Sequence, residues 1–249
     1  MGKAEMTHAA TMSDDTGRLP PSVVAKTAAL CVAGLVLLSI VIGVAGRWFG
    51  HSISMAGHTD DTRLHEIVIG NDVIVAPANA IRFDHARRDG IAQRLDLYMR
   101  WPDLAGYSEA FRDDFNTTGS GRRIVFASFE PRLMSRDMSD RLDPIYRALI
   151  EKSGRRGPAG LTVFAFTAKS GYADEELVVG ERLGQSPFVA RCLTGARAEQ
   201  SLAGCQRDID VGDGLSLSYR FSENLLPEWR KLDAAVTAKA RSMMRTSRP

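Results

Sequence analysis

Apolar and polar residues alternate in several short segments of the chain beyond residue 90, and this alternation predicts β-strands with one buried face. In the segment RLDLYMRW (94–101), every second side chain is apolar. The segment LSLSYRF (215–221) repeats the pattern. Clean alternation is typical of antiparallel sheets that have one side in water.

More continuous apolar runs predict strands buried on both faces or lying at the centre of a sheet. These runs are EIVIGNDVIVAP, RIVFASF, LTVFAFT and ELVVG. Within the first, Gly70-Asn71-Asp72 predicts a tight turn between two strands, because Gly and Asn tolerate the positive φ that a hairpin turn needs. Asp213-Gly214 predicts a second hairpin turn.

Two helices are predicted. Asp143 and Pro144 supply an N-cap and a first-turn proline for one of them. Pro227 opens the other, an amphipathic helix over 227–244 whose apolar stripe starts at Trp229. We expect that stripe to pack on the chain's own sheet, with a partner helix or the membrane interface as alternatives. The predicted fold class is therefore α+β, a β-rich antiparallel sheet or sandwich with peripheral helices.

One segment differs from all others, because residues 27–46 (TAALCVAGLVLLSIVIGVAG) contain no charge. Twenty helical residues span roughly 30 Å, the thickness of the hydrocarbon core of a bilayer. We predict a transmembrane helix that acts as an uncleaved signal anchor. The alternative is a signal peptide cleaved after Ala45, but the apolar run is longer than usual for such peptides and a long polar leader precedes it.

Flanking charge predicts the orientation of this span. Three basic residues (Lys3, Arg18 and Lys26) precede it, against Arg47 and Arg63 at a comparable distance after it. Because positive flanks stay inside, we expect residues 1–26 to form a disordered cytoplasmic tail. Residues 47–64 then read as a tether, and residues 65–249 as one periplasmic domain of a protein in the inner membrane.

The cysteines beyond the predicted span are consistent with a domain that is exported from the cytoplasm. Cys192 and Cys205 are the two cysteines beyond the span, separated by twelve residues, and such a pair in an exported domain predicts a disulfide. A zinc site would need two further ligands, and no histidine follows His85.

The sequence offers little catalytic chemistry. The net charge of +2 gives no indication of nucleic-acid binding. No serine-nucleophile elbow and no histidine metal motif is present, and we predict no cofactor and no metal. The acidic stretch 208–214 departs from the spacing of a calcium loop. Neighbouring carboxylates at Asp113-Asp114 and at Asp174-Glu175-Glu176 leave open a hydrolase of an envelope polymer.

Aromatic residues suggest a contact surface. Trp101, Tyr107 and Phe111 are interleaved with arginines and acids, and Trp229 leads the C-terminal stripe. Such mixtures occur at protein interfaces, although the same side chains could cap the core. We therefore expect a membrane-anchored, non-enzymatic accessory protein that assembles with an envelope partner. The alternatives are the hydrolase and a membrane sensor that signals through a partner.

Overall fold

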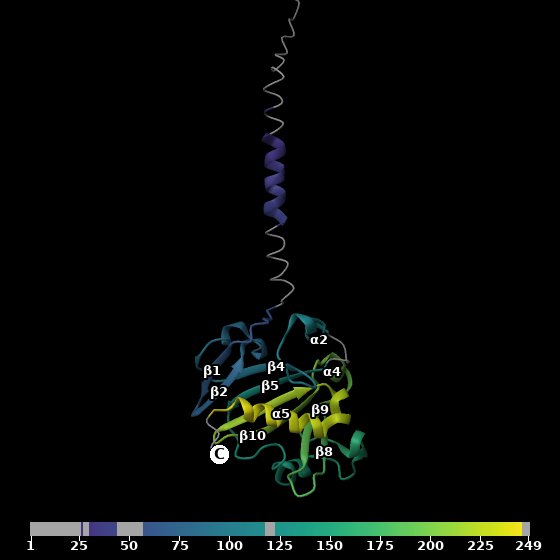
Figure 1. Cartoon of the computed structure of the whole chain (residues 1–249). Helices are drawn as coiled ribbons and strands as arrows, with labels where there is room; N and C mark the ends of the chain where they lie inside the picture. The colour runs from purple at the N-terminus through teal and green to yellow at the C-terminus, as the bar shows by residue number, and fades with distance from the viewer. Residues whose placement is uncertain (1–25, 27–29, 44–56, 118–122, 246–249) are drawn as a thin grey trace, which may run out of the picture. The chain divides into compact units, whose positions relative to one another are not determined.

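The computed structural model describes residues 26, 30–43, 57–117 and 123–245 (Figure 1). The chain divides into two compact units, Met1–Ala56 and Gly57–Pro249. In the first unit, residues 30–43 are helical with exposed side chains. No helix in the described ranges combines the length and the apolar character that crossing a bilayer requires. Part of the predicted organisation falls outside these ranges. This applies to the predicted cytoplasmic tail except Lys26, to both ends of the predicted span (27–29 and 44–46), and to tether residues 47–56.

The second unit is α+β, as predicted, and is dominated by antiparallel strands. Its strands are β1 (Leu64–Ile69), β2 (Asp72–Pro77), β3 (Gly90–Ile91), β4 (Leu95–Arg100), β5 (Ile124–Pro131), β6 (Arg155–Arg156), β7 (Leu161–Ala165), β8 (Glu175–Gly180), β9 (Phe188–Leu193), β10 (Cys205–Val211) and β11 (Leu215–Phe221). Its main helices and turns are α2 (Arg112–Asn116), η4 (Leu142–Tyr146), α3 (Arg147–Leu149), α4 (Gly195–Gln200), η6 (Glu223–Glu228) and α5 (Trp229–Met243).

These strands form two sheets. A small sheet has the order β2-β1-β3, and a large one has the order β4-β5-β11-β10-β9-β8-β7-β6. Both predicted hairpin turns are confirmed. The chain reverses at Gly70 between β1 and β2, and at Gly212 between β10 and β11; both glycines have positive φ, 61° and 63°.

The compact unit begins earlier than the predicted boundary at residue 65. His58, which we placed in the tether, stacks on Tyr107 with 4.7 Å between ring centroids. Its Nδ1 lies 2.9 Å from the hydroxyl of Tyr98. Tyr98 was expected on the wet face of its strand, but these rings and Phe115 cover it, and only 2% of it is exposed.

The C-terminal helix packs on its own sheet. α5 crosses the strands β9 and β10 in Figure 1 and contributes Trp229, Leu232 and Val236 to the main hydrophobic cluster. Gly180 on β8 makes room for the indole, because a Cβ there would lie 2.7 Å from the Trp229 ring. The helix is shorter than predicted, since residues 223–228 form the 3₁₀ turn η6 instead.

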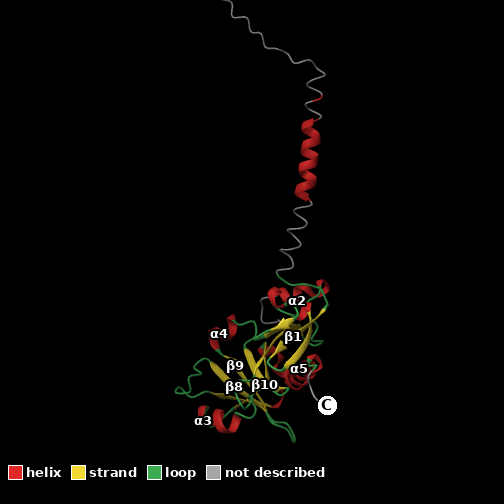
Figure 2. Ribbon diagram, turned by 90° about the vertical axis from the view of Figure 1, so that its left-hand side faces the viewer, coloured by secondary structure: helices red, strands yellow, loops and turns green. Residues whose placement is uncertain are grey.

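The predicted helix after Asp143 appears as the short pair η4 and α3, which packs a second, smaller hydrophobic cluster against β8 and β9. Alternate residues of these strands point to the two clusters: Val178 belongs to the main one, Leu177 and Val179 to the smaller. Figure 2 shows α5 and α3 on opposite sides of the strands. This half of the large sheet is therefore covered on both faces.

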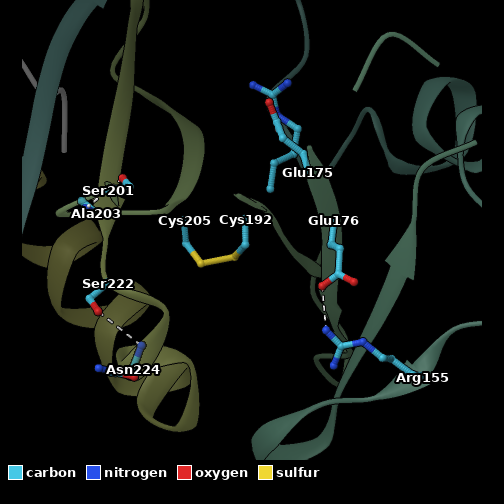
Figure 3. Close-up of a disulfide and its surroundings, with 10 residues drawn as sticks. Arg155, Glu175, Glu176, Cys192, Ser201, Ala203, Cys205, Ser222 and Asn224 are labelled. Carbon is cyan, nitrogen blue, oxygen red and sulfur yellow. Dashed lines mark hydrogen bonds and ion pairs between the residues drawn. A yellow bond between two sulfur atoms is a disulfide. The ribbon is translucent and has the colours of Figure 1, made fainter. Parts of the chain in front are cut away.

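The two halves of the large sheet meet at a narrow seam. β9 and β10 pair at only two positions, Cys205 with Cys192 and Gln206 with Arg191. The predicted disulfide occupies the first of these positions, with both cysteines buried (Figure 3). The staple thus joins β4-β5-β11-β10 to β9-β8-β7-β6 at the place where they have the fewest main-chain bonds.

Beyond the staple, a buried ionic cluster fills the space where β10 leaves β9. Asp233 of α5 accepts hydrogen bonds from the Arg207 Nε at 2.8 Å and from the Tyr219 hydroxyl at 2.6 Å. Arg207 also donates through Nη1 to the Val189 carbonyl of β9 and to Ser139 Oγ. Arg182 Nη2 lies 2.7 Å from the second oxygen of Asp233. The cluster connects both half-sheets to the C-terminal helix.

The charge state of this cluster follows from its surroundings. Burial raises the pKa of Asp233, but Arg207, Tyr219 and Arg182 together outweigh burial and hold the pKa below its ordinary value. Burial raises the pKa of Tyr219 well above its ordinary value, and the Asp233 charge adds to the effect. An ionised carboxylate therefore accepts from a neutral phenol and balances part of two guanidinium charges.

Replacing both stapled cysteines tests the seam. The double variant Cys192→Ala/Cys205→Ala should lose about 3 kcal/mol of unfolding free energy, because the unfolded chain regains the entropy of the closed loop. The measurement is urea unfolding of the full-length chain followed by circular dichroism. Cys31→Ala, which removes the free cysteine of the helix at 30–43, is the control and should unfold like the parent. Equal midpoints for all three proteins would contradict a stabilising staple.

Replacing the central carboxylate tests the cluster. Asp233→Asn should cost about 3–5 kcal/mol of unfolding free energy, because it leaves the buried Arg207 guanidinium and the partly buried Arg182 guanidinium without their counter-charge. Asp113→Asn is the matched control, since that side chain is 97% exposed, and its change should stay within about 0.5 kcal/mol.

The pH dependence of the unfolding free energy is a second way to test the role of Asp233. A folded-state pKa below the unfolded value of about 3.9 means that Asp233 contributes stability above that pH and loses the contribution as pH falls through the folded value. The gap between the parent and Asp233→Asn should thus be widest near neutrality and shrink below about pH 4. A gap independent of pH would argue against an ionised Asp233.

Candidate functional site

The face of the first half-sheet that points away from α5 is polar. Across its four strands, Asp96 of β4, Ser128 of β5, Ser218 of β11 and Asp208 of β10 stand directly opposite one another. The sequence neighbours of each are buried residues that point to the interior, so alternation places this row on the far side. Neither hydrophobic cluster includes a residue of the row. We call this surface the polar sheet face.

Arginines lie along the polar sheet face and pair with its acids. The Arg94 guanidinium contacts Asp96 at 2.8 Å and Glu130 at 3.0 Å, and it donates to Ser128 Oγ at 2.9 Å. At the other end, Arg141 donates to both oxygens of Asp208, at 2.5 and 2.7 Å. The result is a half-exposed field of alternating charge on a rigid sheet.

A shallow groove of about 210 Å³ runs between this face and the segment that follows β5. Its floor is formed by Ser216, Ser218 and Asp208, and its rim by Leu133 and Met134. The rim side chains are exposed to 91% and 55%. Large apolar side chains held in water beside a polar sheet are a feature of protein contact surfaces, where apolar and polar groups are mixed.

The acidic stretch after Cys205 is part of this surface. Asp208 pairs with Arg141 and Asp210 with Arg132, so arginines instead of a cation balance these carboxylates. Burial raises the pKa of Asp210, which Arg132 partly offsets. In the described part of the chain, no group of three or more His, Cys, Asp or Glu side chains is arranged to hold a metal ion.

The carboxylates considered for hydrolysis do not converge. Asp113 is solvent-exposed on α2, and Asp114 beside it contacts Arg100 at 3.5 Å. Glu175 and Glu176 lie on β8, where Glu176 accepts from Arg155 at 2.6 Å (Figure 3). Being consecutive on a strand, the two glutamates point to opposite faces. Neither pair of neighbours faces a common pocket in the way a glycosidase pair does.

The aromatic residues predicted as a contact surface are mostly inside the domain. Trp101, Tyr107 and Trp229 are at most 4% exposed, so they pack in the core of this structure. Phe111 is 44% exposed, and the Arg100 guanidinium lies 3.4 Å from its ring centroid. Of the four, Phe111 is therefore the one that presents a surface.

Comparisons with known proteins give no family. No family model matches the chain, and no curated protein matches it. Among solved structures, it is similar to Smlt3025, an immunity protein of the Stenotrophomonas maltophilia type IV secretion system, with 13% identity and a TM-score of 0.49. That likeness covers 73% of this chain and 93% of the other.

A second solved structure is the Neisseria meningitidis iron-regulated outer membrane lipoprotein FrpD, with 8% identity and a TM-score of 0.44. This likeness covers 75% of this chain and 94% of the other. At such identities and TM-scores, neither likeness supports an inference about what this chain does. The candidate site thus depends on the geometry of the polar sheet face alone.

Sequence reasoning did not identify this site. The alternation in β11 indicated a wet face, but nothing in the chain indicated that Asp96, Ser128, Ser218 and Asp208 would form one row. These residues are up to 122 positions apart in the sequence, and the order of the strands sets their pairing. A charged, mixed face of this kind is suited to binding another macromolecule by polar contacts with apolar edges.

Proposed function

We propose that this chain is a single-pass protein of a bacterial inner membrane whose C-terminal domain lies in the periplasm and acts there by binding a protein partner. In this proposal the domain is not an enzyme. The observation that carries the binding role is the polar sheet face, with its row of paired charges and its exposed rim at Leu133 and Met134.

Two features support the membrane and compartment parts of the proposal. Residues 27–46 form a charge-free run long enough to span a bilayer, with more basic residues before it than after it. The domain carries a buried disulfide at its seam, and such bonds persist in oxidising compartments such as the periplasm.

The binding role is supported by what the surface offers. One half of the large sheet has hydrophobic clusters on both faces, whereas the other half has one on a single face. The remaining face of that second half is the polar sheet face, which is half-exposed. Carboxylates hold the guanidinium groups on it in fixed positions, so the pattern of charge is pre-organised. Pre-organised charge gives an interface its specificity and orientation.

Cysteine accessibility in cells tests the topology. Because both native sulfurs of the domain are buried, we place a reporter at the fully exposed Leu183, as Leu183→Cys in a Cys31→Ala background. A membrane-impermeant maleimide should label it in intact cells once the outer membrane is permeabilised. Ser13→Cys, in the N-terminal tail, should label only after lysis. Labelling of Ser13→Cys in intact cells, with Leu183→Cys protected, would reverse the orientation.

Site-specific cross-linking tests the polar sheet face. A photoreactive phenylalanine analogue at Leu133 should give one defined protein adduct in cells. Ser218→Arg should reduce that adduct at least tenfold, because it adds an unpaired charge to the middle of the row. The same analogue at Glu199 on α4, which borders neither this face nor its groove, is the matched control and should give no such adduct.

The proposal is contradicted if the adduct at Leu133 persists in Ser218→Arg while circular dichroism shows an unchanged fold. It is also contradicted if Leu133 and Glu199 give the same set of adducts, since that pattern reflects crowding and not a defined surface.

A further inference from the structure

A second hollow lies on the opposite side of the sheet, between α5 and the loop that joins β8 to β9. Its volume is about 660 Å³. One wall is a stripe of α5 that begins at Arg230, continues through the small residues Ala234 and Ala238, and ends at Arg241. The other wall is formed by loop residues Glu181–Gln185. We call this hollow the α5 groove.

The α5 groove is basic along its length. Arg230 and Arg241 are eleven positions apart on the helix, which places them about 16 Å apart at 1.5 Å per residue. Arg182 enters from the loop. Arg241 forms no ion pair with a described residue, and Arg230 donates only to the main-chain carbonyl of Ala159 while lying over the Trp229 ring.

One of the two acids at the groove is already paired with arginines. Asp233 forms part of its floor, but it is shared between Arg207 and Arg182. The lining of the groove therefore holds two carboxylates, Asp233 and Glu181, against the three guanidinium groups of Arg182, Arg230 and Arg241. Arg182 also has a buried Nε that donates to no acceptor among the described residues. A buried donor without an acceptor costs free energy, so Asp233 satisfies the Arg182 guanidinium only in part.

We infer that the α5 groove binds an extended acidic segment of a protein partner, with a carboxylate seated near Arg182 and others toward Arg230 and Arg241. Arginine is suited to this role because its planar guanidinium binds carboxylates in a bidentate manner. The length of about 16 Å holds about five residues of extended chain at roughly 3.3 Å each.

The shape of the groove favours a peptide over a membrane surface. The Arg182 side chain is only 23% exposed and is recessed between helix and loop, where the headgroups of a flat bilayer cannot follow. Its walls also present apolar groups, namely Ala234, Ala238 and the fully exposed Leu183, which can contact the stems of peptide side chains. This inference rests on the proposed partner-binding function and names the chemistry of one partner segment.

Titration with hexaglutamate tests the inference on the full-length chain in a zwitterionic detergent, by calorimetry at low salt. Hexaglutamate should bind and uncharged hexaglutamine should not. Arg241→Gln should weaken binding about tenfold, the loss expected for one charge-assisted hydrogen bond. Ala234→Leu, which fills the groove without changing charge, should weaken it as much. Lys231→Gln on the same helix lies outside the groove and should bind like the parent.

Three results would overturn the inference. They are no binding of hexaglutamate, equal weakening in Arg241→Gln and Lys231→Gln, and full binding in Ala234→Leu. A further titration uses vesicles that contain phosphatidylglycerol. If the chain binds these vesicles through Arg241 and does not bind hexaglutamate, the groove is a lipid site and the inference is wrong. Because the titration contains no cellular partner, its outcome is independent of the cross-linking at Leu133, and the two proposals can fail separately.

Discussion

The contact between Arg207 and Asp233 is the interaction on which the arrangement of this domain depends. Arg207 stands on β10 at the position where β9 stops pairing with it, and its guanidinium reaches the β9 carbonyl that lies across the gap. Asp233 brings the C-terminal helix to the same point. One guanidinium therefore holds three elements where main-chain hydrogen bonds are fewest. Removing either buried partner leaves the other charge unpaired, so a substitution at either residue is strongly destabilising.

That arrangement also separates the two candidate surfaces. α5 packs on one side of the sheet, with the α5 groove along it, while the polar sheet face points to the other side. Both surfaces are built on strands and a helix, whose side chains have fixed directions. Connecting loops supply the rest, namely the wall of the α5 groove that carries Arg182 and Leu183 and the rim of the polar sheet face at Leu133.

Much of this fold could be predicted from periodicity, because short-range patterns report short-range structure. The hairpins at Gly70 and Gly212, the strand alternation and the disulfide between Cys192 and Cys205 each depend on residues close in sequence. The ionic cluster was missed, although a signal existed. Arg207 is in phase with the buried Cys205, Ile209 and Val211, and a charge at a core position of a strand requires a buried partner. Asp233 likewise falls beside Leu232 on the buried side of its helix. The polar row had no such signal, since it is created by strand order.

The staple has a consequence for cleavage of the chain. The residues between its two cysteines include α4, whose side chains are largely exposed and belong to neither hydrophobic cluster. Exposed segments of this kind are where proteases cut folded domains. A single cut in α4 would sever the backbone between β9 and β10 but leave the two fragments joined through sulfur. The domain could then pass through a proteolytic environment nicked and still in one piece, until a reductant released it.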